Sequence, residues 1–222
     1  MAAQKTSIAV PTPNQIADAA VSLGRVLDGE QVLGLSRYLE LLLVWNQRMN
    51  LVGPQDWHTI LADLIADSWH LADFLNSLNL PEAPCTVDLG AGAGLPGLPL
   101  RLFWPHGVYH LVEIRRKRTA FLLQVLSAMQ LQRTFVRPQR AEQALPALAP
   151  VDLCLSRAFL PWPELLKLVK PWLARGAAVV IMANEPVPSV MPPDWVATGS
   201  HRYTGSDKDR YFWSLVPANI SR

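Results

Sequence analysis

The sequence predicts an α/β fold in which a mostly parallel sheet follows a helical N-terminal region. Apolar residues from Gln15 to Phe74 recur at intervals of three and four, which is typical of amphipathic helices. Beyond Pro81, short β-rich runs alternate with helical runs, which is typical of successive βαβ units with helices on both faces of a sheet. We therefore expect a helical extension over residues 1–80 and a sheet-containing core over residues 81–222, packed as one compact unit.

Three helices are expected before residue 81. Gly29 and the Gly53-Pro54 pair interrupt the apolar periodicity, and Asp56 is suited to cap the third helix. The β-rich runs that follow are CTVDL (85–89), VYHLVEI (108–114), TFVRP (134–138), VDLCLS (151–156) and AAVVIMA (177–183). The intervening helices are expected from Leu95, from Arg116, around Glu142 and from Pro163. Segments 195–203 and 211–216 flank a polar stretch, so they predict an antiparallel pair that closes one edge of the sheet.

Composition excludes several classes of protein. Half of the 222 residues are hydrophobic, which excludes a disordered chain, and a net charge of +2 is too small for a protein that coats nucleic acid. Cys85 and Cys154 form no CxxC pair and have no histidine at ligand spacing, so no metal site is expected. No run reaches the roughly 18 apolar residues of a membrane span, and the N-terminus lacks a signal-peptide pattern. These features predict a cytoplasmic protein without a membrane partner.

The segment VDLGAGAGLPGLPL (87–100) lies between the first β-rich run and the first helix of the core. Glycines there let the backbone turn tightly and approach a ligand, and the following helix presents free N–H groups, so a nucleotide-like ligand is indicated. Residues 92–97 satisfy the GxGxxG dinucleotide pattern, and Glu113 follows Gly94 by 19 residues, so spacing leaves a dehydrogenase open. Asp88 favours S-adenosylmethionine instead, because a carboxylate suits its cationic amino-acid end and repels a pyrophosphate.

Several motifs, in order, resemble those of one family. They are WNQRMNL (45–51), Asp67-Ser68, DLGAGAGLPGLPL (88–100), Glu113 with Lys117-Arg118, and SRAF (156–159). Together they resemble the bacterial small-subunit ribosomal RNA guanine-N7 methyltransferases, the glucose-inhibited division protein B (RsmG) family. The resemblance implies a class I S-adenosylmethionine-dependent methyltransferase with a Rossmann-like, seven-stranded sheet whose last strand is antiparallel. It also implies that the substrate is a guanine of 16S RNA, as free RNA or in the 30S particle.

The loop chemistry and the resemblance together predict the cofactor site. The resemblance implies that Gly90 and Leu95 line it, that Ala141-Glu142 hold the adenine region, and that Arg157 borders the cofactor or at most contacts guanine O6. Both the loop chemistry and the resemblance predict that Glu113 binds the ribose hydroxyls of the cofactor. The complete set of cofactor candidates is Asp88, Gly90, Gly92, Gly94, Leu95, Glu113, Ala141, Glu142 and Arg157.

Two positions depart from the family pattern. Asp63-Leu64 stand where relatives carry a basic residue and histidine, and Ala183-Asn184 stand where they carry lysine and glycine. His70 or Lys170 could substitute for the missing cations. The departures concern the handling of RNA and not the cofactor.

The chemistry of N7 methylation requires no general base, because N7 carries a free lone pair. Holding the reactants in line suffices, and Arg157 and Ser156 are the candidates for positioning, with no catalytic residue assigned. Arg115, Arg116, Lys117, Arg118 and Arg137 are candidates for contacting RNA phosphates, with Arg48, Arg101, Arg133 and Arg140 as further members of a local basic patch.

Two other functions remain open at the level of sequence. The two departures are compatible with a non-catalytic cofactor-binding module that binds RNA or the ribosome, and the GxGxxG spacing is compatible with a nicotinamide-dependent oxidoreductase. The leading prediction is a monomeric rRNA methyltransferase.

Overall fold

The structure, a computed structural model, describes residues 9–205 and 208–218. Its helical region contains α1 (Pro13–Ser22), α2 (Gly29–Met49), α3 (Trp57–Ile60), a π-helical turn (Leu61–Ile65) and α4 (Ala66–Asn76). Thr12 and Asp28 form capping boxes at α1 and α2, and the Asp56 carboxylate accepts a hydrogen bond from Thr59 N at 2.9 Å. The expected helices and the Asp56 cap are confirmed, with the third helix running on continuously through the π turn into α4.

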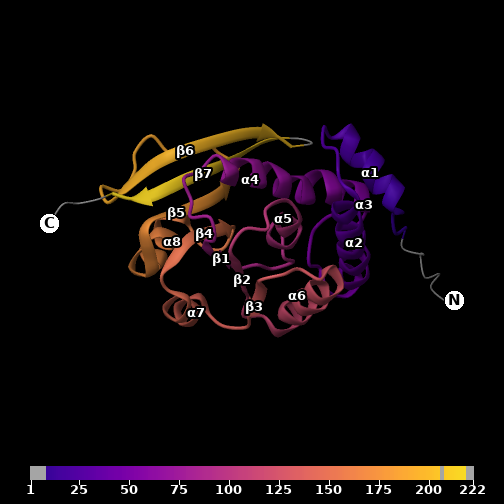
Figure 1. Ribbon diagram of the computed structural model, residues 1–222, viewed down its shortest axis with the longest axis horizontal. Helices are drawn as coiled ribbons and strands as arrows, with labels where there is room; N and C mark the ends of the chain where they lie inside the picture. Colours follow the sequence, from indigo (N-terminus) through magenta and orange to yellow (C-terminus); the bar gives the residue numbers. More distant parts are fainter. Residues whose placement is uncertain (1–8, 206–207, 219–222) are drawn as a thin grey trace.

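A seven-stranded sheet follows, in the order β3-β2-β1-β4-β5-β7-β6 (Figure 1). Its strands are β1 (Cys85–Leu89), β2 (Val108–Val112), β3 (Thr134–Arg137), β4 (Val151–Arg157), β5 (Leu173–Ala183), β6 (Trp195–Thr204) and β7 (Asp209–Pro217). The first five are parallel to one another, and β7 runs antiparallel to both β5 and β6. The predicted fold class and the edge-closing pair are therefore confirmed. Ser206 and Asp207 of the predicted polar stretch lie outside the described residues, as do residues 1–8 and 219–222 of the two predicted regions.

The remaining helices alternate with the strands: α5 (Gly97–Phe103), α6 (Arg116–Met129), α7 (Ala141–Leu148), α8 (Trp162–Val169) and a 3-10 turn (Lys170–Trp172). One prediction is wrong by two residues, because the first helix of the core begins at Gly97 and not at Leu95. Residues 92–96 form turns that lead the chain from β1 to α5.

Side chains alternate between the two faces of the sheet, and each face has its own apolar cluster. Leu153, Leu155 and Val180 pack with α1 to α6 in one cluster, while Cys154 and Val179 pack with α7 and α8 in the other. Figure 1 shows α2, α4, α5 and α6 together on one side of the strands, with α7 and α8 on the other. The N-terminal helices therefore share a core with the sheet, because they supply much of the cover for one of its faces.

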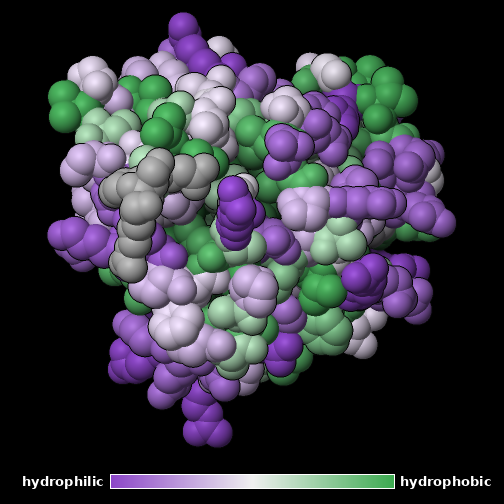
Figure 2. Space-filling view, turned by 60° about the vertical axis from the view of Figure 1, so that its left-hand side comes forward, coloured by the Kyte–Doolittle hydropathy of each residue, from purple (hydrophilic) through white to green (hydrophobic). Residues whose placement is uncertain are grey.

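The surface carries no large apolar face in the view of Figure 2, where hydrophobic side chains interrupt the hydrophilic ones in several small areas. None of the helices in residues 9–205 and 208–218 is both long and apolar enough to cross a bilayer. Within the same residues, no group of three or more His, Cys, Asp or Glu side chains is placed to hold a metal ion.

Candidate active site

The glycine loop leaves β1 at the point where the strand order reverses, between β1 and β4. Ligands of open parallel sheets bind in the crevice at this point, outside the carboxyl ends of the strands. Gly90, Gly92 and Gly94 have φ values of 73°, 58° and 74°, in the left-handed region that glycine adopts without strain. The amides of Gly90 and Ala91 donate to Val112 O, at 3.0 and 3.1 Å, so the loop is tied to the end of β2.

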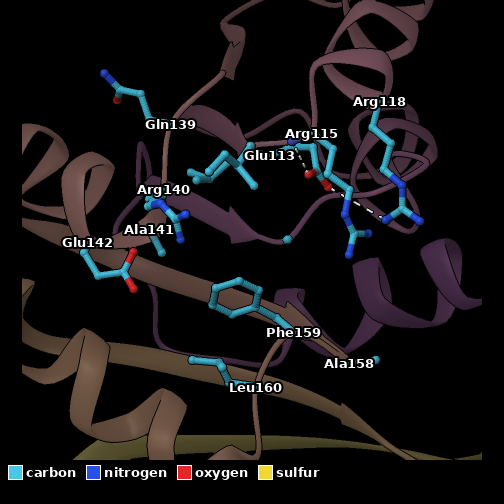
Figure 3. A pocket seen from close by; sticks show the side chains of 13 residues that line it. Glu113, Arg115, Arg118, Gln139, Arg140, Ala141, Glu142, Ala158, Phe159 and Leu160 are labelled. Atoms are coloured by element: carbon cyan, nitrogen blue, oxygen red, sulfur yellow. Dashed lines mark hydrogen bonds and ion pairs between the residues drawn. The ribbon is translucent and has the colours of Figure 1, made fainter.

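Glu113 stands directly after β2, and its side chain is 5% exposed. One carboxylate oxygen accepts a hydrogen bond from Gly92 N at 3.1 Å, and the other accepts one from Arg115 N at 2.8 Å. The Arg118 guanidinium lies 3.9 Å from the first of these oxygens (Figure 3). Each oxygen can accept a further hydrogen bond, so the carboxylate is fixed in place and still able to bind a ligand.

A cavity of about 370 Å³ opens beside Glu113, and we call it the first cavity. This volume falls in the range of small-molecule sites. Figure 3 shows Glu113 and Arg115 on one side and Ala141 and Glu142 on the other, with the Phe159 ring between them. The lining residues are Gly90, Val112, Glu113, Ile114, Arg115, Arg118, Gln139, Arg140, Ala141, Glu142, Ala158, Phe159 and Leu160.

Four of the nine cofactor candidates, Gly90, Glu113, Ala141 and Glu142, thus line the same cavity. Asp88 is not among the lining residues: it is 2% exposed, and its carboxylate accepts a hydrogen bond from the Tyr109 hydroxyl at 3.2 Å. Burial raises the pKa of Asp88 to about 7, against weaker opposing effects of Tyr109 and Arg157. Asp88 is therefore buried and does not line the first cavity, and its expected contact with a ligand stays a prediction.

Gly92, Gly94 and Leu95 also lie outside the first cavity, for reasons of packing. A Cβ on Gly94 would lie 2.4 Å from a methyl carbon of Leu98 and 2.9 Å from one of Leu122, so the absent side chain makes room for α5 and α6. Gly92 contributes its amide to Glu113, and Leu95 packs against the apolar cluster. These residues shape the loop and do not form the wall of the cavity.

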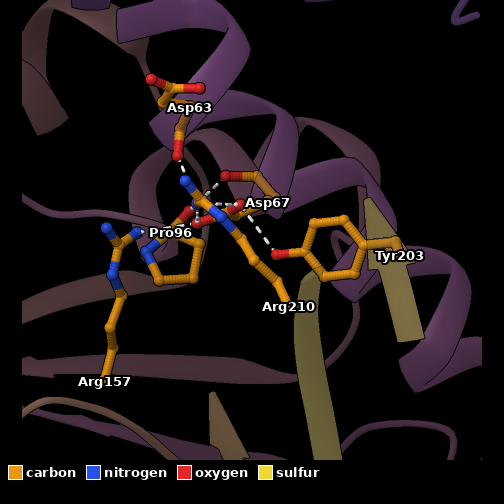
Figure 4. A network of polar contacts seen from close by, with 7 residues as sticks. Asp63, Asp67, Pro96, Arg157, Tyr203 and Arg210 are labelled. Carbon is orange, nitrogen blue, oxygen red and sulfur yellow. Dashed lines mark hydrogen bonds and ion pairs between the residues drawn. The ribbon is translucent and has the colours of Figure 1, made fainter. Parts of the chain in front are cut away.

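Arg157 lies in a second cavity of about 430 Å³, and the two cavities meet at Ala158, which lines both. Arg157 Nη1 donates to Asp67 at 3.0 Å, and the same carboxylate accepts from Arg210 and from the Tyr203 hydroxyl, each at 2.7 Å (Figure 4). The other lining residues are Pro54, Asp63, Leu64, Met182, Ala183, Asn184, Lys208, Tyr211 and Phe212. Ser156, the other positioning candidate, is 3% exposed within β4 and lines neither cavity.

Both departures from the family pattern, Asp63-Leu64 and Ala183-Asn184, line this second cavity. Neither suggested substitute supplies a cation there. Lys170 pairs with Asp194 in another part of the molecule, and the His70 ring stacks on Tyr203 at 4.5 Å between centroids. Burial lowers the pKa of His70, with a further contribution from His201. The cations that do line the second cavity are Arg157, Lys208 and Arg210.

The predicted basic patch is divided. Arg115 and Arg118 line the first cavity, while Arg116 and Lys117 are exposed at the start of α6. Arg137 is half-buried, with its guanidinium 5.6 Å from the Phe135 ring centroid and its Nε donating to His110 Nδ1 at 3.3 Å.

The assignment of Arg101 to the patch is wrong. Arg101 is 5% exposed and donates to the carbonyl oxygens of Trp104, Pro105 and His106, so its charge is used to hold the turn after α5.

Asp67 and Phe159 belong to the family motifs but were assigned no role from the sequence, and Tyr203, Lys208 and Arg210 were not singled out; all five line one of the cavities. Asp67 offered a signal, because it lies at helical spacing on a stripe of apolar residues, where an acidic side chain requires partners. Tyr203 and Arg210 offered none, since their hairpin predicts only the closing of a sheet edge.

Comparisons with known proteins agree with this architecture. The GidB family, described as rRNA small subunit methyltransferase G, matches residues 31–186. The ribosomal RNA small subunit methyltransferase G of Oleidesulfovibrio alaskensis is 42% identical over 211 residues, covering 90% of this chain and 92% of the relative. The protein of the same name from Nitratidesulfovibrio vulgaris is 48% identical over 183 residues, covering 82% and 84%.

Solved methyltransferase structures show the same fold at low sequence identity. The O-methyltransferase TomG of Streptomyces achromogenes, solved in complex with S-adenosylmethionine, aligns with a TM-score of 0.60 at 17% identity, covering 91% of this chain and 95% of TomG. An rRNA methylase of Streptococcus thermophilus aligns with a TM-score of 0.51 at 15% identity, covering 67% and 94%. The match to the family over residues 31–186 and the identity to full-length relatives show that this chain belongs to the rRNA small subunit methyltransferase G family, and it is an S-adenosylmethionine-dependent methyltransferase.

Proposed function

We propose that this methyltransferase binds S-adenosylmethionine in the first cavity and methylates N7 of a guanine in small-subunit ribosomal RNA. The observation that carries the proposal is Glu113, whose buried carboxylate is held by Gly92 N and Arg115 N at the mouth of the glycine loop. Family membership supports the reaction, and the geometry of the first cavity supports the roles that we propose for its residues.

The first cavity suits an adenosine. The two oxygens of Glu113 each keep a free lone pair, so they can accept hydrogen bonds from both hydroxyls of a ribose. We assign Ala141 and Glu142, at the start of α7, to the adenine region, and the apolar Phe159 and Leu160 to the opposite wall. We assign Asp88, Gly92, Gly94 and Leu95 to support of the loop and not to contact with the cofactor.

The reaction needs alignment and no proton transfer. S-adenosylmethionine supplies an activated methyl group when bound. The N7 lone pair of guanine forms a bond to the methyl carbon while the bond from that carbon to sulfur breaks and its electron pair stays on sulfur. Gly90, Ala158 and the side chains beside them hold the two reactants against each other, which is worth about 7 to 11 kcal/mol in favourable cases.

The proposal includes the partner and the state of the protein. The substrate is small-subunit RNA or the 30S particle, the protein acts in the cytoplasm as a monomer, and no metal takes part. Arg115, Arg116 and Lys117 are exposed beside the first cavity, so we propose them as the phosphate-contacting group, with Arg118 facing the cofactor. The shared apolar cluster supports treating the described parts of the helical region and of the sheet-containing core as one compact unit.

The test is transfer of labelled methyl from S-adenosylmethionine to small subunits that lack the modification, followed by mass spectrometry of the RNA. We expect label on one guanine as 7-methylguanine. Glu113→Gln is expected to raise the Kd for S-adenosylhomocysteine about 10-fold or more, because the neutral amide is a poorer acceptor for the ribose hydroxyls. Arg175→Gln, an exposed change on β5 remote from both cavities, is the matched control.

Absence of label from RNA, with S-adenosylhomocysteine still bound, would contradict the enzymatic proposal and favour a non-catalytic binding module. Preference for NADH over S-adenosylhomocysteine in calorimetry would favour the oxidoreductase. None of the comparisons supports either alternative.

A further inference from the structure

We infer that the second cavity receives the target guanine and that Arg157 recognises its O6 atom there. The inference rests on the proposed function and assigns its acceptor site. The second cavity is lined by residues of α4, β4, β5 and the β6–β7 hairpin, and it adjoins the first cavity.

Ala158 is the point at which the two cavities meet. Its φ of 52° lies in the left-handed region, which is uncommon for a residue with a side chain. This turn follows directly on the end of β4, where Arg157 lines the second cavity and Phe159 lines the first. A methyl acceptor must lie within a few ångströms of the methyl donor, and the second cavity is the neighbouring space that satisfies this condition.

Arg157 is fixed on one side and free on the other. A single hydrogen bond, from Nη1 to Asp67, ties its side chain to the residues that the structure describes, and 31% of the side chain is exposed. A guanidinium has five N–H donors, so most of them remain for a substrate. The hydrogen bond to Asp67 orients the guanidinium before the substrate binds, so the Arg157 side chain loses less conformational entropy on binding.

Asp67 positions Arg157 and does not itself contact the base. Its two oxygens accept hydrogen bonds from Arg157, Arg210 and Tyr203, at 2.7 to 3.0 Å, and the side chain is 7% exposed. Arg210 also donates to the carbonyl oxygen of Asp63, and its buried Nε has no partner among the described residues. Two arginines on one carboxylate leave a positive charge at the cavity, as recognition of an RNA nucleotide requires.

Contact of Arg157 with O6 agrees with the chemistry of the reaction. Guanine presents O6 as an acceptor, whereas adenine presents an amino group at the same position, so a donor at O6 selects guanine. An arginine that also bonded N7 would occupy the nucleophile. Contact with O6 alone gives selection of guanine and leaves the N7 lone pair directed at the first cavity.

The experiment compares two target bases in two proteins. The modified position is mapped with the wild-type protein, and small subunits are reconstituted with either guanine or 2-aminopurine there, since 2-aminopurine keeps N7 and lacks O6. We expect the wild-type protein to prefer guanine about 10- to 100-fold in kcat/KM, and Arg157→Gln to lose that preference through a slower reaction with guanine. The Kd for S-adenosylhomocysteine should change less than 3-fold in Arg157→Gln, whereas Glu113→Gln raises it.

A binding measurement makes the inference independent of turnover. Guanosine 5′-monophosphate is titrated into protein saturated with S-adenosylhomocysteine, with adenosine 5′-monophosphate as the comparison and NMR as the readout. We expect preference for the guanine nucleotide in the wild-type protein and in Arg175→Gln, and its loss in Arg157→Gln. Equal preference in Arg157→Gln and wild type, or weakening of S-adenosylhomocysteine binding to the extent seen in Glu113→Gln, would overturn the inference. Failure of methyl transfer with the nucleotide preference intact would instead overturn the proposed function.

Discussion

Asp88 connects the stability of this protein to pH in a direction opposite to that of most carboxylates. Burial in the folded state raises the pKa of Asp88 from 3.8 to about 7, whereas the unfolded chain leaves it near its ordinary value. The folded protein therefore holds a proton that the unfolded protein has released between about pH 4 and pH 7. Stability falls as pH rises through that window, since the folded state binds more protons than the unfolded state.

The magnitude follows from the size of the shift. A shift of about three pKa units, at 1.36 kcal/mol each, lowers the free energy of unfolding by about 4 kcal/mol above pH 7. Roughly 1.5 kcal/mol of this loss is already present at pH 5. Asp88→Asn keeps the shape and an acceptor for the Tyr109 hydroxyl but does not ionise. We expect the gain in stability of Asp88→Asn over the wild type to be about 2.5 to 3 kcal/mol larger at pH 8 than at pH 5.

The assay is urea denaturation of both proteins at a series of pH values, with the difference between them as the readout. This difference removes the contributions of Asp56 and Asp194, whose pKa values are lowered by hydrogen bonds and whose stabilisation is lost toward acid pH. Equal pH dependence in the two proteins would refute the account of Asp88. The same variant also tests its location: we expect a Kd for S-adenosylhomocysteine within about 3-fold of wild type, and a large weakening would restore the predicted contact with the amino-acid end of the cofactor.

Three further outcomes follow from single positions. Gly94→Ala should lower the free energy of unfolding by about 2 to 4 kcal/mol in urea melts, because the new methyl group clashes with Leu98 and φ is 74°. The control Gly176→Ala has φ 79° and open space around it, so it should lower the free energy of unfolding only by the backbone strain of about 1 kcal/mol. Arg115→Gln should weaken RNA binding and reduce the slope of log K against log salt by about 0.7 to 1, and an unchanged slope would remove it from the phosphate contacts. Ala158→Val should lower kcat about 10- to 100-fold with little change in cofactor Kd. Ala158→Gly accepts φ 52°, so its free energy of unfolding should stay within about 1 kcal/mol of the wild type. Equal kcat in both variants would contradict the role of the turn.

The strands were predictable because each combines β-rich composition with a boundary of turn residues, as in CTVDL before the glycines. The start of α5 was harder to place, since Leu95 is apolar and could begin a helix, and the loop geometry alone moves the start to Gly97. The antiparallel hairpin was predicted as an edge, but its strand order was not: β7 inserts between β5 and β6. Order within a sheet depends on pairing between segments distant in sequence, which local patterns do not encode.

The candidate site likewise contains residues whose position the sequence predicts and residues whose position depends on partners that it does not show. Glu113 was predictable, because a carboxylate one βαβ unit after a glycine loop reaches the same edge of the sheet. Arg101 was misplaced, and Asp88 is more deeply buried than its predicted role suggests, for a shared reason: a charged residue near a motif suggests a ligand, whereas the sequence does not show burial or a local partner. The Tyr109 hydroxyl and three backbone carbonyls are those partners, and the sequence shows neither.

The N-terminal helical region supplies part of the lining of the second cavity, where we place the acceptor base. Asp67 comes from α4, Arg157 from β4 and Arg210 from β7, so the network that orients Arg157 exists only when the helical region is docked on the sheet. Residues 67 and 210 are 143 positions apart, and their contact closes one wall of the second cavity. The first cavity, by contrast, is lined by residues at the ends of β1, β2, β3 and β4 and at the start of α7. The two cavities therefore differ in origin: the first is lined by residues of the sheet-containing core, whereas the second also requires the helical region and the β6–β7 hairpin.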